Sequence, residues 1–514
     1  MDRKWWTLIV VSIAAFMLLI DLTIITVVLP DIQSDLHAGF SSVQWMIDAY
    51  ALTLAAFLLS AGSLADRYGR KRLFLIGLIV FTGGSVLCAA ARNADLLTAS
   101  RAVQGVGGAI LFATALSLLA ANFHGRDRGV AFGVWGAVTG IAAALGPVAG
   151  GLISLSWLGW RGVFWVNLPI GIAAIVICVL TTPESKAQHT ARLDWGGFLT
   201  LTAALVALVY GIIRAGEVSL GDQLALGCLI GAVLLLAVFA VIEARVRQPM
   251  FDLKLLRIPT FLGGSVAAFA MNGSLYALML YLVLYLQNAL GYSALMAGLQ
   301  LFVVSAVSMV FAIVAGTLSS RGVPARWLIG SGLLLVAAGL FAMLGQGPDS
   351  GWTGLLAGFV LTGMGSGLVN PLLAETAVGV VHYQRSGMAS GSNTTFRQIG
   401  IAVGTAVYGT IFATTLGDNL RANLAGSPAL AARAGQIAGE VRGGSIAQTV
   451  TQFPVQLREQ VGVAVHSGFA TSMDTLFAVS GGLALVGAIV AVFLVRGKDF
   501  VSAAPEKPAV AAVG

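Results

Sequence analysis

The sequence predicts an all-α polytopic membrane protein, and three observations support this class. Of the 514 residues, 58% are hydrophobic and only 10% are charged, whereas about a quarter of an average soluble chain is charged. The mean hydropathy of +0.90 excludes intrinsic disorder, and the 64 glycines follow no G-X-Y repeat, which excludes collagen. The apolar residues form continuous runs instead of alternating at every second position, so we expect helices and not barrel strands.

Fourteen apolar runs are each long enough to cross the hydrocarbon core, which takes roughly 20 residues. The first run begins like a signal peptide, because charged residues precede a long apolar stretch from Trp5. The stretch is too long, however, and no small-residue cleavage site precedes Pro30, so we expect a first transmembrane helix. The runs cover residues 5–30, 43–65, 73–91, 96–120, 129–153, 163–182, 197–213, 222–242, 259–287, 293–318, 327–345, 352–374, 397–416 and 469–495.

The basic residues predict how the helices are oriented. If the N-terminus is inside, most of the 29 Lys and Arg residues fall in inner segments, as the positive-inside rule requires. Arg385 and Arg397 are counted there, the latter at the inner end of the run 397–416. Both termini are therefore expected in the cytoplasm. The net charge of +7 forms no dense basic patch, which argues against nucleic acid as a partner.

A weak internal repeat predicts how the chain divides. The segment GSLADRYGRKR at 62–72 has a degraded copy, GTLSSRG, at 316–322, where the acid is missing. The two copies begin 254 residues apart. Six helices with their loops take only roughly 200 residues, so the extra residues imply an inserted helical hairpin. We expect a six-helix bundle at 1–182, the hairpin with its linkers at 183–258, a second bundle at 259–498 with a long outer loop at 418–466, and a disordered tail at 499–514.

Five segments resemble motifs of one family, in the order in which that family has them. They are LIDLTIITVVLP at 19–30, GSLADRYGRKR at 62–72, LTASRAVQGVGGA at 97–109, GAVTGIAAALGPVAGG at 136–151 and WRGVFWVNLPIG at 160–171. Together they resemble the major facilitator superfamily, and in particular its 14-helix drug:proton antiporters, over nearly the whole chain. Thr26 stands where the first motif usually has asparagine. The resemblance implies the major facilitator fold, two six-helix bundles plus two extra central helices, around a cavity that opens alternately to each side.

Three charged residues inside the predicted spans are candidates for proton coupling. An ionisable group near the membrane centre costs at least about 2.5–3.5 kcal/mol, so it marks a pathway by default. Asp21, Asp48 and Arg101 all fall in the outer half of the membrane. An acid that moves relative to a guanidinium changes its proton affinity and can act as a proton switch. Asp48 and Arg101 are close enough to span ends that they could instead reach the headgroups, and the sequence leaves open which aspartate takes the proton.

The segment at 62–72 predicts a conformational latch. A tight turn closed by glycine places cations at the inner headgroup layer, with an acid among them at a helix end. By the resemblance, this ion pair steadies one access state; alternatively, the cations only anchor the loop inside. The residues concerned are Gly62, Asp66, Arg67, Gly69 and Arg70.

The helix at 129–153 carries the motif that antiporters share. Small residues at three- and four-residue spacing allow helix backbones to approach closely, and a proline permits a kink. Close packing alone would explain the pattern, and the antiporter role follows only from the resemblance. The residues are Gly136, Gly140, Gly146, Pro147, Gly150 and Gly151.

Four polar residues are candidates for the substrate pocket. Asn272, Tyr276 and Tyr281 run along one span, with methionines nearby, and Asn370 precedes a proline that could break its helix. Aromatic and methionine side chains suit flat apolar cations through stacking and cation–π contacts.

Signals of catalysis are lacking. The chain has no phosphate-binding G-x-x-x-x-G-K-[ST] segment, its five histidines have no metal-ligand spacing, and its three cysteines each sit in an apolar run. We therefore expect neither an enzyme nor a metal, and no cofactor beyond the proton gradient.

The sequence as a whole predicts a proton-coupled antiporter. We expect it to export amphipathic, often cationic drugs or antibiotics from the cytoplasm by alternating access. Its partners would be these substrates, protons and the lipid bilayer, and we expect a monomer in a bacterial inner membrane. One alternative is a dedicated exporter of a single lipid or endogenous metabolite on the same fold. A remote alternative is an uncoupled channel or a membrane scaffold.

Overall fold

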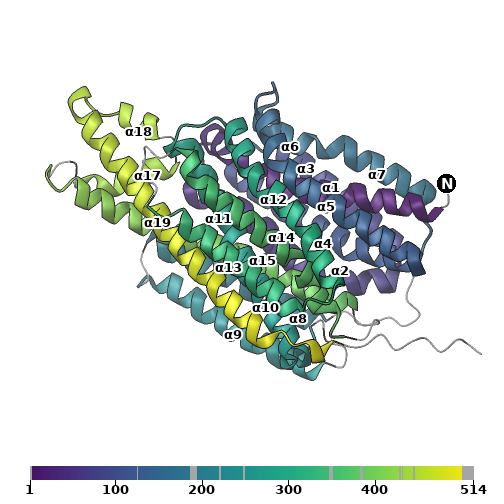
Figure 1. Cartoon of the computed structure of the whole chain (residues 1–514). Helices are drawn as coiled ribbons and strands as arrows, with labels where there is room; N and C mark the ends of the chain where they lie inside the picture. Colours follow the sequence, from purple (N-terminus) through teal and green to yellow (C-terminus); the bar gives the residue numbers. More distant parts are fainter. Residues whose placement is uncertain are drawn as a thin grey trace, which may run out of the picture.

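The computed structural model describes residues 3–500, and all regular secondary structure in that part is helical, with no strand (Figure 1). The all-α class predicted above is therefore confirmed. Described residues exclude a few internal segments, and the predicted tail from residue 501 onward also lies outside them. The internal segments are 124, 186–193, 219–220, 247–248, 250, 346–350, 382–385, 428–429, 431 and 444–445.

The first half of the chain forms a bundle in which α1 packs on α5, and α2 and α3 both pack on α4. A helix long enough to span the membrane hides its polar backbone, which is why each apolar run folds in this way. These helices are α1 (Arg3–Asp35), α2 (Phe40–Tyr68), α3 (Arg70–Ala89), α4 (Ala94–Asn122), α5 (Gly125–Ser154), α6 (Gly162–Trp165) and α7 (Asn167–Thr181).

The second bundle begins with a span that is not a uniform α-helix. The span consists of α10 (Pro259–Met271) and α11 (Ala277–Leu284). One π-helical turn, η3 (Asn272–Tyr276), separates these two helices, and a second, η4 (Tyr285–Ala289), follows α11. Such turns are frequent at functional sites. The other helices are α12 (Ala294–Ser320), α13 (Ala325–Ala342), α14 (Leu356–Val378), α15 (Ser386–Asn423) and α19 (Val455–Leu494).

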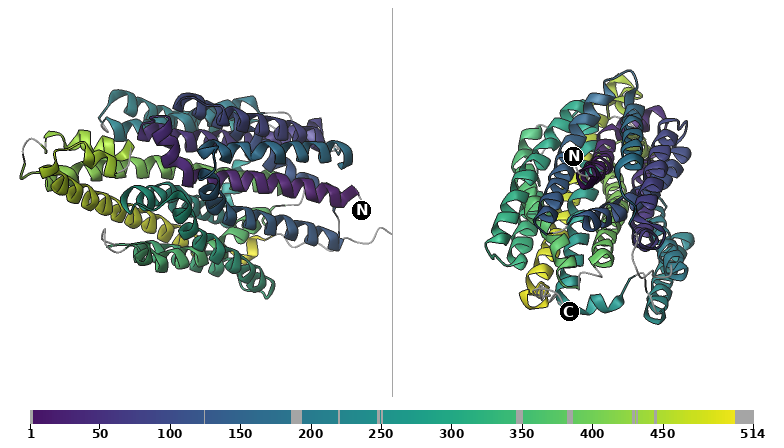
Figure 2. Two further views of the ribbon diagram at one scale, coloured as in Figure 1. Left: turned by 90° about the horizontal axis from the view of Figure 1, so that it is seen from above. Right: turned by 90° about the vertical axis from the view of Figure 1, so that its right-hand side faces the viewer.

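Two further helices, α8 (Trp195–Glu217) and α9 (Gln223–Arg245), form the hairpin between the bundles. They pack on each other, and α8 also contacts α2 and α15, so the hairpin stands at one edge of the molecule (Figure 2). Each begins at an aspartate, Asp194 and Asp222, whose carboxylate accepts a backbone N–H of the first turn. Such caps fix where a helix starts.

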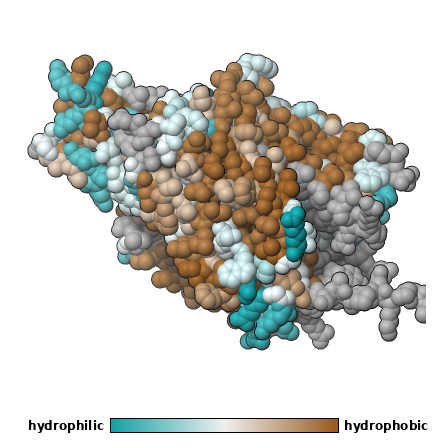
Figure 3. All heavy atoms as spheres, in the orientation of Figure 1, coloured by the Kyte–Doolittle hydropathy of each residue, from teal (hydrophilic) through white to brown (hydrophobic). Residues whose placement is uncertain are grey.

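Within the described residues, 12 helices are long and apolar enough to cross a membrane. The predicted spans 43–65 and 129–153 are also helical, as α2 and α5, but both contain side chains outside the described part. The count of fourteen spans therefore stays a prediction. The face seen in Figure 3 carries a broad hydrophobic belt, and hydrophilic residues gather at the end formed by α17, α18 and the start of α19.

The predicted outer loop at 418–466 is largely helical in the structure. α15 continues to Asn423 and α19 already starts at Val455, with α17 (Ala434–Gly443) and α18 (Ile446–Thr451) between them. With 38 and 40 residues, α15 and α19 are roughly 57 and 60 Å long at 1.5 Å per residue, about twice the hydrocarbon thickness. They project beyond the bundles (Figure 1), and their apolar faces stabilise the projection. These faces contribute Leu416, Leu420, Val461, Val465 and Phe469 to one apolar cluster, which Leu424 after α15 and Ile437 and Val441 of α17 complete.

Candidate functional site

The centre of the first bundle holds a buried ion pair. Arg101 on α4 donates from Nη1 to Asp21 Oδ2 on α1 at 2.7 Å, and the two side chains are 1% and 0% exposed. Arg101 Nε also donates to the Met46 carbonyl at 3.3 Å. The guanidinium carbon lies 4.2 Å from the ring centroid of Tyr50 on α2, a cation–π arrangement. Arg101 therefore does not reach the headgroups.

A polar network surrounds this pair. Gln104, one turn along α4, accepts from Arg101 Nη1 at 2.6 Å and donates to Asp21 Oδ1 at 2.8 Å. Asn167 of α7 donates to the same Asp21 oxygen at 2.9 Å. Ser85 of α3 accepts from both amides, at 2.8 and 3.2 Å. Side chains from α1, α3, α4 and α7 thus form one network around a single carboxylate, whose hydrogen-bonding capacity is satisfied inside an apolar bundle.

Sequence reasoning did not assign Gln104, Asn167 or Ser85 to the proton-coupling site. Two signals were present: Gln104 lies three residues from Arg101, on the same helix face, and Asn167 is a polar residue in an otherwise apolar helix. Ser85 gave no signal, because isolated serines are common in membrane helices. The contact between α3 and α4 brings Ser85 to the site.

Asp48 is not part of this network. It lies on α2 and is completely buried, and neither of its carboxyl oxygens has a hydrogen-bond partner among the residues that the structure describes. The predicted grouping of Asp21, Asp48 and Arg101 is therefore corrected: in the described part of the chain, Arg101 pairs with Asp21 and not with Asp48. The physical reason is the rotation of α2, which turns Tyr50 instead of Asp48 toward the guanidinium.

The end of the bundles that holds Asp35, predicted to face outward, is closed. Gln44 of α2 donates to the Tyr281 hydroxyl and to the Thr405 carbonyl, each at 3.1 Å. Gln287 in η4 donates to the Val27 carbonyl at 2.7 Å. These bonds join the first half of the chain to the second. We call this group, with the aromatic residues packed on it, the outer closure.

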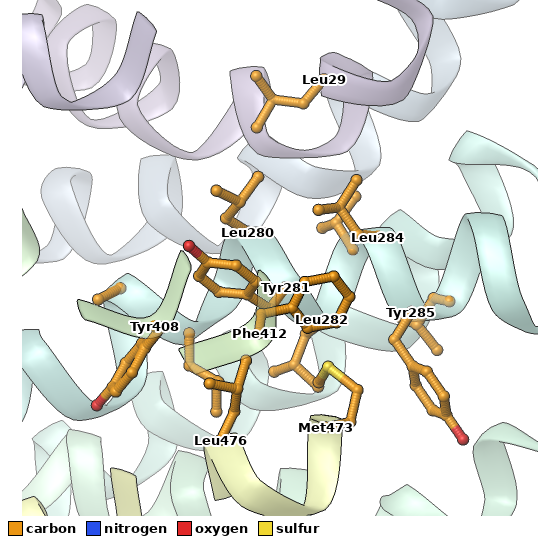
Figure 4. Packing of buried hydrophobic residues seen from close by; sticks show 14 of the residues in the cluster. Leu29, Leu280, Tyr281, Leu282, Leu284, Tyr285, Tyr408, Phe412, Met473 and Leu476 are labelled. Atoms are coloured by element: carbon orange, nitrogen blue, oxygen red, sulfur yellow. The ribbon is translucent and has the colours of Figure 1, made fainter. Parts of the chain in front are cut away.

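Aromatic rings fill the outer closure. The Tyr281 ring lies 6.0 Å from Phe40 and 5.9 Å from Phe412, and its hydroxyl donates to the Thr405 carbonyl at 2.6 Å. Figure 4 shows Tyr281, Phe412 and Leu29 within this packing. Tyr281 is 0% exposed, so in this conformation it belongs to the seal between the halves and does not line an open pocket as the sequence suggested.

The antiporter motif on α5 allows three helices to meet. Gly146 and Gly150 pack against Thr23 and Ile24 of α1, where a Cβ on Gly150 would come within 2.7 Å of the Ile24 carbonyl oxygen. Gly151 packs against Leu295 of α12 in the second half. Glycines at these positions therefore let α5 connect the bundles at the outer closure. The Pro147 carbonyl oxygen meets Gly298 of α12, while the surroundings of Gly136 and Gly140 lie outside the described residues.

Only part of the predicted latch is described. Gly69 has a φ of 112°, a backbone conformation that favours glycine, and a Cβ there would also meet the carboxylate of Glu184. Both the conformation and the close contact therefore require glycine. Glu184 accepts from the backbone N–H groups of Lys71 and Arg72 at 3.0 and 3.2 Å, which stabilises the start of α3. Arg70 donates from its backbone to the Ser185 carbonyl at 2.9 Å.

The other latch residues give no test of the ion pair. The side chains of Asp66 and Arg67 lie outside the described residues, and Gly62 has open space around it. Sequence reasoning missed Glu184, because a single acid after a span is an ordinary feature of a loop.

The remaining pocket candidates separate into two groups. Tyr276 and Asn370 meet, since the Asn370 amide donates to the Tyr276 hydroxyl at 3.2 Å. Asn272 is buried and donates to the Ala268 carbonyl of its own helix instead. Arg397, which the sequence placed at the inner end of its span, lies inside α15 and donates to the Asn370 carbonyl at 3.1 Å.

Known membrane transporters resemble this chain in sequence and in fold. The chain is 33% identical over 494 residues, 96% of its length and 91% of the relative, to the tetracenomycin C resistance and export protein of Streptomyces glaucescens. It is 34% identical over 78% of its length, and 74% of the relative, to the multidrug resistance protein Stp of Mycobacterium tuberculosis strain CDC 1551. A bacterial homologue of the lysosomal transporter Spinster, solved in an inward-facing, unoccupied conformation, has the same fold: its TM-score is 0.63 at 18% identity, with 98% of this chain and 99% of that chain covered. The sequence profile of the Major Facilitator Superfamily matches residues 11–405, and the protein is a multi-span membrane transporter that belongs to this family.

Proposed function

We propose that the protein is a proton-coupled antiporter that exports amphipathic drugs or antibiotics across the bacterial plasma membrane by alternating access. The observation that carries the proposal is the buried Asp21–Arg101 pair, on which four helices converge. The resistance and export functions named for the relatives support the cargo class. Both termini would lie in the cytoplasm, no cofactor would be needed, and the monomer would be the working unit.

Asp21 is the group that exchanges a proton in each cycle. As a carboxylate it accepts from Arg101, Gln104 and Asn167, which holds α1 to α4 and α7. A proton that arrives from outside removes the charge, and the neutral acid no longer holds the guanidinium by a charge-assisted bond. The helices are then free to change their relative positions, and release of the proton to the inside restores the network.

Asp48 carries a proton throughout. It is completely buried and neither of its oxygens has a partner. An unpaired carboxylate would cost far more in this environment than the neutral acid. The two aspartates therefore have different roles, and only Asp21 is placed to change its charge when the outer closure opens.

Transport in reconstituted vesicles tests the proposal. Wild type should move ethidium only when a pH gradient is imposed. Asp21→Asn and Arg101→Ala should abolish the ethidium movement that the pH gradient drives. Asp48→Asn, which mimics the neutral acid, should keep this gradient-driven movement. Asp35→Asn is the matched control, because Asp35 lies on the same helix and pairs with Arg161 at 2.7 Å, but at the surface. Undiminished transport by wild type without any proton gradient would refute coupling.

A dedicated exporter of one compound is the second candidate. The relative matched over 96% of this chain is named for a single compound, tetracenomycin C. A well-folded wild type that moves its one cargo under a pH gradient, but not ethidium, would favour this candidate over multidrug export.

A further inference from the structure

A cluster of polar side chains in the second bundle has a role that the proton network does not explain. We propose that Arg397, with Tyr276 and Asn370, forms a subsite for the acidic group of an amphipathic aromatic substrate, a carboxylate or a phenolate. This inference rests on the proposed export function, because it specifies the chemical class of the exported substrate. The subsite itself is defined by charge, hydrogen bonds and position.

Arg397 is a membrane-embedded cation for which the described part of the chain provides no counter-ion. It lies eleven residues inside α15, which begins at Ser386. Its Nη2 donates to the Asn370 carbonyl, and its Nε has no hydrogen-bond partner. No carboxylate forms an ion pair with it among the residues that the structure describes. Arg101 in the first bundle, by contrast, has Asp21. A guanidinium left unpaired at this depth needs an anion to neutralise it.

Other unpaired polar atoms lie close by on the same helix. The Asn393 amide nitrogen and the Gln398 amide oxygen are buried without partners, four residues before and one residue after Arg397. Buried polar groups are nearly always satisfied, so such a group of exceptions points to a missing ligand. The Tyr276 hydroxyl accepts from Asn370, which leaves its own proton available to donate to an anion.

The cluster lies where the two halves of the chain meet. Thr395, two residues before Arg397, donates to the Ala55 carbonyl of α2 in the first half at 3.4 Å. Tyr276, Asn370 and Arg397 are each partly exposed. They lie where α15 contacts α2, η3 and α14, so the cluster stands at the boundary between the two halves, which a substrate would pass under alternating access.

The body of the substrate would extend toward the outer closure. Tyr281 follows Tyr276 by five residues, roughly 7.5 Å along the helix axis. Tyr281 packs there with Phe40, Tyr408 and Phe412 (Figure 4). The aromatic rings around Tyr281 and the cation of Arg397 together fit a flat molecule with an acidic group at one end. Asp21 is neutralised by Arg101 and Asp48 is fully buried, so neither offers a free charge to a cationic drug.

Binding of two flat fluorescent probes to the purified full-length protein tests this inference without any gradient. Fluorescein is anionic near pH 7.5 and ethidium is cationic, and anisotropy reports the binding of either. Arg397→Gln should raise the Kd of fluorescein at least about tenfold, since hydrogen bonds to a charged group are lost. Arg397→Lys should weaken fluorescein binding less than Arg397→Gln does, because it keeps the positive charge but loses the several donors of the guanidinium. Ethidium binding should not weaken in either variant.

Two more variants separate charge recognition from misfolding. Asn370→Asp supplies an internal counter-ion for Arg397, so it should weaken fluorescein binding and leave ethidium binding unweakened, a selective loss that an unfolded protein cannot give. Arg421→Gln is the matched control, because Arg421 is an exposed arginine that pairs with Asp418. The inference is overturned if wild type does not bind fluorescein, if Arg397→Gln binds it equally well, or if Asn370→Asp binds fluorescein as tightly as wild type. Arg397-dependent binding without proton-driven efflux would instead refute only the proposed antiport.

Discussion

Removal of the charge on Asp21 is the perturbation from which the structure predicts the largest effect. In Asp21→Asn the buried Arg101 loses its counter-ion. The amide cannot replace the carboxylate, because Asp21 accepts from Arg101 on one oxygen and from Gln104 and Asn167 on the other. Whichever way the amide turns, its N–H₂ group faces a donor.

The magnitude follows from burial. Breaking a buried pair by removing one partner costs about 3–5 kcal/mol, whereas an exposed pair contributes about 0.2–1 kcal/mol. The Asp35–Arg161 pair has the same length, 2.7 Å, but its side chains are 49% and 35% exposed. Asp21→Asn should therefore lower the thermal unfolding midpoint clearly, and Asp35→Asn should leave it nearly unchanged.

A double variant separates stability from coupling. Asp21→Asn with Arg101→Gln removes both charges, so the unpaired guanidinium is gone and much of the lost stability should return. Proton coupling should not return, because the carboxyl group that exchanges the proton is gone. Vesicles that contain a pH-sensitive dye report proton movement driven by added ethidium, and thermal unfolding reports stability. Drug-driven proton movement in either variant at the wild-type rate would refute the reasoning.

Three further predictions concern other parts of the structure. Gly151→Val should destabilise the contact between α5 and Leu295 of α12 by about 1–3 kcal/mol, with Gly227→Val, whose site has open space, as the control in thermal unfolding. Gln44→Ala removes two hydrogen bonds between the halves, so Leu29→Cys in that background should react faster with a maleimide added from outside; an unchanged rate would contradict the assignment of the outer closure. At the hairpin, hydrogen bonds from Arg214 and from the Ala225 backbone lower the pKa of Asp222. Because the folded pKa lies below the unfolded one, this stabilisation is present above about pH 4 and is lost as the pH falls through the lowered pKa. The difference in unfolding midpoint between wild type and Asp222→Asn should therefore shrink below pH 4, and a difference that grows would contradict it.

The sequence predicted the membrane class and the positions of the helices, because a span depends on local composition. Every apolar run coincides with a helix, or a chain of helical turns, in the structure. Asp21 and Arg101 could also be chosen from the sequence, since a charge inside a span is costly wherever its helix turns. The outer ends of α15 and α19 were harder to predict, because their apolar positions lie among Ala, Gly and Gln and their partners are distant in sequence.

What only the tertiary structure decided was the direction in which each side chain points. A soluble helix shows its buried face by amphipathic periodicity, but a membrane helix is apolar all round, because lipid and protein interior are equally apolar. The sequence therefore could not tell that Arg101 meets Asp21 and Tyr50 and not Asp48. For the same reason, it could not place Tyr281 in the outer closure or Arg397 beside Asn370. Helix positions were fixed by local hydrophobicity, whereas helix rotations depended on contacts between segments far apart in the chain.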